Sequence, residues 1–137
     1  MSGADEIVYD EFPEAIRRIH AALRDLETVA EAVPLALALL EHGWTSGSQG
    51  TPEGLAWDRL GVSASILVGM LFPDQQRYAL MVTGRADDPD LVVAGRELAL
   101  AAADGLDFLS GEPGTSDERR RSLRKAAANL RSLAEPL

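Results

Sequence analysis

The sequence predicts an all-α fold, an up-down bundle of four main helices, and three observations lead to it. Apolar residues recur at steps of three and four along most of the chain, which is the spacing that lines one face of a helix. Glycine, proline and serine gather in short stretches between those runs, where turns are expected. The 137 residues are 46% hydrophobic and 26% charged, the balance of one globular domain spanning residues 1–137.

The first predicted helix is a long one, over about residues 12–42. Its apolar stripe keeps register across Pro34, a residue type that removes a backbone hydrogen bond and crowds the preceding turn. We therefore favour one helix kinked near Pro34, with two helices that break at Val33 as the alternative. The stripe consists of Ile16, Ile19, Leu23, Leu26, Ala30, Val33, Leu37 and Leu40.

A second helix is predicted over residues 52–71, after a loop rich in glycine and serine. Thr51, Pro52 and Glu53 match an N-cap, a first helical residue and a favourable first-turn acid. Glycines inside this range weaken the helix but leave its period intact. The apolar stripe consists of Trp57, Leu60, Ala64, Leu67 and Leu71.

Residues 66–83 allow two interpretations. The register of the second helix extends to Leu71, so we favour a helix end, a corner at Pro73 and a short helix over residues 74–84. The same apolar runs also match the two strands of a β-hairpin joined by a tight turn. Periodicity alone does not separate a short buried strand from a buried helix.

Two more helices complete the predicted bundle, over residues 89–110 and 116–134. The first of them is apolar nearly all round, which is typical of a helix buried on most sides, so we expect it at the centre. Before the second, Thr115 and Glu118 have the spacing of a capping box.

Charge and composition narrow the classes of partner. The net charge of −9 argues against nucleic-acid binding, because an acidic chain repels phosphate backbones. Residues 1–11 hold four acidic residues and no basic one, so we expect a flexible acidic N-terminus there rather than a signal peptide. Wholly apolar runs are too short to span a bilayer. With no cysteine, these features predict a cytoplasmic protein without a membrane partner.

The basic residues are twelve arginines and one lysine, a bias typical of GC-rich, actinobacterial genomes. Five of them form a basic run at 119–125, in the first turns of the last predicted helix, where positive charge opposes the helix dipole. A solvated face is the simpler interpretation of this run. The functional one is contact with an acidic surface, such as residues 1–14 of this chain or of a second copy.

No metal or cofactor site is predicted. The chain has two histidines and no cysteine, and neither histidine follows the Glu-x-x-His spacing of helical di-metal sites. The sequence contains neither a nucleophile elbow nor a phosphate-binding loop. We therefore expect no bound metal and no cofactor, and leave open whether the chain is an enzyme.

His20 and Asp104 are the candidate catalytic residues. His20 borders the stripe of the first helix, where a ring packed at the rim is the simpler interpretation and a general acid–base the sharper one. Asp104 lies beside alanines in the apolar helix, so we expect it to be semi-buried. Pairing with an arginine is favoured over a raised pKa of the kind that marks functional carboxylates. The candidate partners are Arg17, Arg24, Arg59 and Arg96.

Three large aromatic residues in a chain with only seven suggest a ligand site. Trp44 and Trp57 flank the glycine-rich loop, and Tyr78 follows farther along the chain. A core position for Trp57 and a lid position for Trp44 is the simpler interpretation. In the functional one the rings form the wall of a pocket, with Asp58 and Arg59 as polar contacts.

Two functional hypotheses follow. In the favoured one, the bundle encloses a small-molecule pocket near the 43–58 loop, as an enzyme or accessory protein of bacterial specialised metabolism. In the alternative, the chain is a non-catalytic homodimeric interaction or regulatory protein, because the first predicted helix is longer than a four-helix bundle needs. A homodimer is compatible with both hypotheses.

Overall fold

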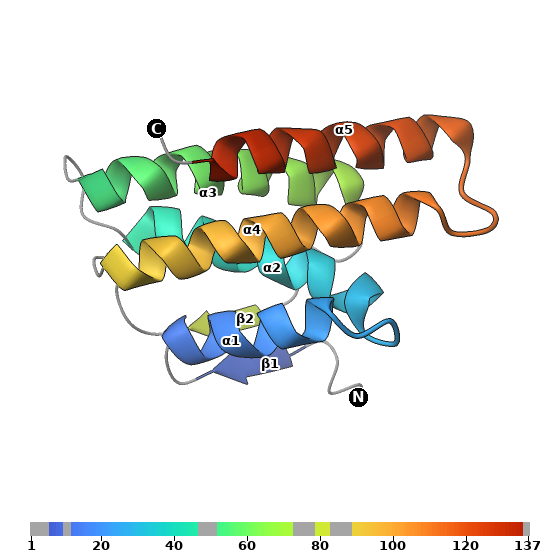
Figure 1. The fold of residues 1–137 in the computed structure, drawn as a ribbon. Helices are drawn as coiled ribbons and strands as arrows, with labels where there is room; N and C mark the ends of the chain where they lie inside the picture. The colour runs from blue at the N-terminus through green and yellow to red at the C-terminus, as the bar shows by residue number, and fades with distance from the viewer. Residues whose placement is uncertain (1–5, 10–11, 47–51, 73–78, 83–88, 136–137) are drawn as a thin grey trace.

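The computed structural model describes residues 6–9, 12–46, 52–72, 79–82 and 89–135. Within those ranges the chain forms five helices and one pair of short strands, which confirms the predicted all-α class (Figure 1). The helices predicted over residues 52–71 and 89–110 begin and end at the predicted residues. In chain order the elements are β1 (Glu6–Tyr9), α1 (Phe12–Leu23), α2 (Val29–Ser46), α3 (Pro52–Leu71), β2 (Ala79–Val82), α4 (Pro89–Ser110) and α5 (Asp117–Ala134).

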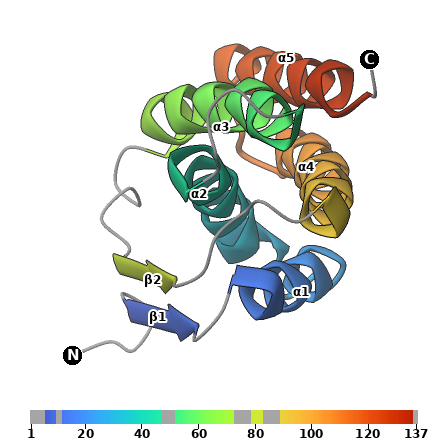
Figure 2. The same ribbon diagram turned by 90° about the vertical axis from the view of Figure 1, so that its left-hand side faces the viewer.

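Helix α2 occupies the centre of the bundle. Helices α1, α3 and α4 pack around it, and α5 lies against α3 and α4 (Figure 2). The sequence predicts that the helix at 89–110 is the central one. That helix, α4, does contact α1, α2, α3 and α5, but one of its edges is exposed to solvent. Between Glu31 and Glu41 the chain has no charged residue, and nearly all of that stretch is buried. An uncharged helix can be enclosed on every side without burying a charge.

The predicted long helix over 12–42 is wrong. Helices α1 and α2 are separate and divide at residues 24–28, not at Val33, while Pro34 lies inside α2. Leu26, which the predicted stripe places on the buried face, is 74% exposed. The spacing of three and four between apolar residues therefore continues across two separate helices that do not share an axis.

Local hydrogen bonds explain the break. The hydroxyl of Thr28 donates to the carbonyl oxygen of Ala22 at 2.7 Å, close to the end of α1. The carboxylate of Asp25 accepts a hydrogen bond from the backbone N–H of Glu27 at 2.9 Å. Such bonds offer the backbone an alternative to helical pairing, and hydrophobic spacing carries no sign of them.

Both interpretations of residues 66–83 need correction. The chain is helical up to Leu71, as predicted, and residues 79–82 form strand β2, so the short helix predicted over 74–84 is wrong there. Residues 73–78 and 83–88 lie outside the described residues. Strand β2 pairs in parallel with β1, with Ile7 opposite Leu80, instead of closing a hairpin. The expected flexible N-terminus thus contributes a strand. The pairing joins segments far apart in the chain, which no local pattern indicates.

The start of α5 also differs from its prediction. Ser116 is the N-cap instead of Thr115, and its hydroxyl oxygen accepts a hydrogen bond from the backbone N–H of Arg119 at 3.1 Å. In the preceding turn Gly114 has a φ of +84°, a conformation that favours glycine. The helix therefore begins at Asp117, one residue later than predicted.

The ring of Trp57 joins three helices. It extends from α3, is fully buried, and lies against Gly43 of α2 and Gly95 of α4. A Cβ atom at either glycine would fall far inside van der Waals contact with ring carbons. Farther along α4, a Cβ at Gly105 would lie 2.6 Å from Cγ2 of Val33 in α2. Because these three glycines have no Cβ atom, the helices can pack this closely.

We expect Gly43→Ala and Gly95→Ala each to lower the free energy of unfolding by about 1–2 kcal/mol, because the cost of overpacking exceeds the gain in helix propensity. Chemical unfolding followed by circular dichroism measures the change. Gly111→Ala is the control, since its Cβ would meet only the carbonyl oxygen of Phe108 at 3.6 Å. Unchanged stability in both helix variants would contradict the packing of Trp57 described above.

Candidate functional site

The predicted aromatic pocket does not include an accessible Trp57. The indole is fully enclosed between α2 and α4, so it is part of the hydrophobic core. Asp58 and Arg59 follow on the next positions of α3, and both are half-buried. The side chain of Trp44, all of Tyr78 and residues 47–51 lie outside the described part of the structure. The one aromatic ring that can be placed therefore supports the core interpretation.

Asp104 is not semi-buried as predicted. Its side chain is 77% exposed and forms an ion pair with Arg131 at 2.7 Å. Asp107 binds the same guanidinium nitrogen at 2.7 Å, and these hydrogen bonds raise the pKa of Arg131 above its usual value. Asp104 thus has the favoured arginine partner, although it is none of the four candidates. Exposed pairs of this kind tie α4 to α5 only weakly.

His20 lies half-buried on α1, at the edge of the packed face, as the simpler interpretation expects. Helix α1 contacts α2 and α4, whereas Asp104 faces α5 through its ion pair. The two candidate catalytic residues therefore lie at different helix–helix interfaces and do not form one site. Among the residues that the structure describes, no cluster of three or more histidine and acidic side chains is placed to hold a metal ion.

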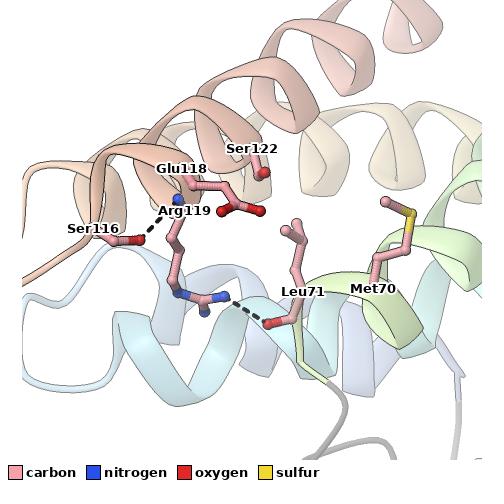
Figure 3. A pocket seen from close by; sticks show the side chains of 6 residues that line it. All are labelled: Met70, Leu71, Ser116, Glu118, Arg119 and Ser122. Atoms are coloured by element: carbon pink, nitrogen blue, oxygen red, sulfur yellow. Dashed lines mark hydrogen bonds between the residues drawn. The ribbon is translucent and has the colours of Figure 1, made fainter.

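The basic run of α5 caps the ends of two other helices. Arg119 donates to the carbonyl oxygen of Leu71, the last residue of α3, at 3.1 Å (Figure 3). Its guanidinium lies 5.7 Å from the centre of the Phe72 ring. Arg120 donates through Nε to the carbonyl oxygen of Ser110, the last residue of α4, at 2.9 Å. Both bonds satisfy carbonyls that a helix leaves unpaired at its C-terminus.

Of the other three cations in that run, Arg124 donates through Nε to the hydroxyl oxygen of Ser110 at 3.4 Å, which leaves Arg121 and Lys125. Neither has an ion pair or a hydrogen bond to any part of the chain that the structure describes. Both side chains are exposed on α5. The prediction of a solvated face thus holds for these two positions, and their charges are available to a partner.

Three of the cavities in the described part of the structure have linings that contain no residue between 43 and 58. The largest of these three, about 660 Å³, is an open groove between α3 and α5. A second, about 200 Å³, continues it towards the N-terminus of α5 and is drawn in Figure 3. A third, about 320 Å³, lies between α1 and α4. The lining of the largest consists of Leu67, Met70, Leu71, Ser122, Lys125, Ala126, Ala128 and Asn129.

Beside that groove, α3 exposes a row of large apolar side chains, which we call the α3 surface. Its members are Leu55, Val62, Ile66 and Met70, between 40% and 69% exposed. The steps of seven, four and four place them on one face, opposite the face that carries Trp57. This spacing is visible in the sequence, but the same helical period also describes the buried stripe on the other side of the helix, so periodicity alone does not show which face is exposed.

The composition of α3 is unusual for a helix with an open face. Residues Gly54–Leu71 have a mean hydropathy of 1.2, and only 35% of this stretch is buried inside the protein. By length and composition alone this helix could cross a membrane, although the core helix of a globular domain meets the same description. In this fold one face of the helix packs against α2, α4 and α5.

No family model, curated protein or solved structure matches this chain. The candidate site is therefore the α3 surface and the adjoining groove, identified by exposure, apolar character and charge alone.

We expect Arg120→Ala to lower the free energy of unfolding by about 1–2 kcal/mol, because it leaves the last carbonyl of α4 without its donor. Arg121→Ala is the matched control: it removes the same charge one residue later, where no contact with the described residues is lost, and should change stability by less than about 0.5 kcal/mol. Thermal unfolding compares the two. Equal effects would contradict the capping role.

Proposed function

We propose that this chain is a non-catalytic interaction protein and that the α3 surface is where another protein binds. The observation that carries the proposal is the row of four large apolar side chains exposed on one face of α3. Val62, Ile66 and Met70 follow one another at steps of four, and Arg59 separates them from Leu55. Contiguous apolar exposure marks protein–protein or membrane contact sites in folded proteins, whereas isolated exposed apolar residues do not.

The setting of the row supports binding of a helix. Leu67 and Met70 continue the row into the groove beside α5, so a partner helix could lie along α3 with its apolar face in that groove. Ser122, Lys125 and Asn129 form a polar rim. An apolar centre with a polar rim is the usual anatomy of a protein interface.

The small-molecule hypothesis has less support. Its pocket wall required an accessible Trp57, which is instead enclosed by the core. Its candidate carboxylate, Asp104, is exposed and paired with Arg131. The groove between α3 and α5 has the volume of a ligand site, about 660 Å³, but it is open along its length and continuous with the α3 surface.

A photo-crosslinking amino acid placed at Met70 tests the proposal in cells that express the full chain. We expect a specific adduct, with the captured peptide identified by mass spectrometry, because Met70 belongs both to the α3 surface and to the lining of the groove. The matched control is the same amino acid at Val93, an exposed apolar residue on α4. No adduct at Met70, or the same adducts at both positions, would contradict the proposal.

A further inference from the structure

We infer that the partner of the α3 surface is an amphipathic helix of another protein, with acidic residues along the edge that faces α5. This inference rests on the proposed function and names the chemistry of its partner. Two observations carry it. The charges beside the α3 surface have opposite signs on its two edges, and the cations on the α5 edge have no ion pair within the described part of the chain.

Helices α3 and α5 form the two walls of the groove. They run antiparallel, with Arg119 near the start of α5 bonded to Leu71 at the end of α3 (Figure 1). Leu67, Met70 and Leu71 supply apolar side chains from the α3 wall. The row from Leu55 to Met70 covers about four helical turns, or roughly 22 Å along α3. A partner helix of about the same length matches it.

The edge of the groove formed by α5 is basic. Between residues 119 and 134 this helix has six basic residues and no acidic one. Four of the six donate hydrogen bonds within the protein, which leaves Arg121 and Lys125. Lys125 lines the groove, and Arg121 lies one turn before it. In a chain with 22 acidic and 13 basic residues, this edge is therefore complementary to acidic groups of a partner.

Arg59 adds a cation within the row itself. It follows Leu55 by four positions and precedes Val62 by three, so it lies on the same face of α3. It is half-buried and has no ion pair with a described residue. A partner that covers the row also covers this guanidinium, and a covered charge is costly unless a group of opposite charge meets it. The partner therefore needs a carboxylate there.

The opposite edge of the α3 surface carries acids. Asp58 and Ser65 are seven positions apart and share one flank of α3, and the Ser65 hydroxyl donates to the Glu41 carboxylate of α2 at 2.7 Å. On the α5 side the cavity linings contain one acid, Glu118, which lies beside Arg119 at the end of the groove (Figure 3). A carboxylate of the partner is thus favoured towards α5 and disfavoured towards α2, which fixes how the partner helix is turned.

A lipid surface or a nucleic acid fits these charges less well. The net charge of −9 is repelled by anionic headgroups and by phosphate backbones. A surface of phosphates would also meet Asp58 and Glu41 on one edge whenever it met Lys125 on the other. A helix with acids on one edge only satisfies the cations without approaching those carboxylates.

Three synthetic helices of about 18 residues test the inference with the full chain. They share one leucine stripe, are cross-linked on the far side to equal helicity, and carry Glu, Gln or Lys along one edge of the stripe. In fluorescence anisotropy we expect the Glu peptide to bind at least about 10-fold more tightly than the Gln peptide, and the Lys peptide to bind most weakly. Salt should reduce the difference. Equal binding of all three, or no saturable binding of the Glu peptide up to about 100 µM, overturns the inference.

Charge reversal shows whether the groove itself makes the distinction. We expect Lys125→Glu to weaken the Glu peptide about 10-fold and to strengthen the Lys peptide by a similar factor. Arg24→Glu is the matched control, because it changes the net charge equally at an exposed position between α1 and α2. It should alter either affinity by less than about 2-fold. Equal effects of the two variants overturn the inference.

The cross-link at Met70 separates this inference from the proposed function. Loss of the specific adduct when Lys125→Glu is added supports both proposals. An adduct that Lys125→Glu leaves unchanged overturns the acidic edge of the partner and leaves the proposed function standing. No specific adduct at Met70, or binding of the chain to anionic vesicles in its place, overturns both.

Discussion

The indole of Trp57 is the contact on which the packing of three helices depends. It fills the space that Gly43 and Gly95 leave open, so α2, α3 and α4 can approach one another only as closely as the ring allows. Interiors are close-packed, and a methyl group added at either glycine has no space to occupy. The same ring fixes which face of α3 points inward.

That orientation has a consequence for the rest of α3. The helix is apolar on both sides, so enclosing the face of Trp57, Leu60 and Ala64 turns Leu55, Val62, Ile66 and Met70 towards solvent. Helix α5 covers only one flank and leaves a groove. The α3 surface is thus a consequence of core packing: the residue that packs between three helices also determines which side chains of α3 are exposed.

Much of the fold could be predicted from hydrophobic spacing, because α3 and α4 are long and bounded by clear capping and turn residues. The break between α1 and α2 could not, since it depends on hydrogen bonds made by Thr28 and Asp25, while the apolar steps continue through it. The β1–β2 pair was missed because its strands come from distant parts of the chain. For the candidate site, hydrophobic spacing places Trp57 on the apolar face of α3 but does not show whether its ring is accessible. Nor does the buried stripe show whether another helix covers the opposite face of α3.

The basic run of α5 destabilises the N-terminus of its own helix but stabilises the C-terminal ends of the neighbouring helices. Positive charge near the start of α5 opposes the dipole of that helix, and Asp117 and Glu118 in its first turn offset part of the cost. Arg119 and Arg120 instead meet the C-terminal carbonyls of α3 and α4, where a dipole favours a cation. Because Arg119 holds the end of α3 against α5, it also keeps Met70 at the mouth of the groove, so the rigidity of the proposed interface depends in part on this contact.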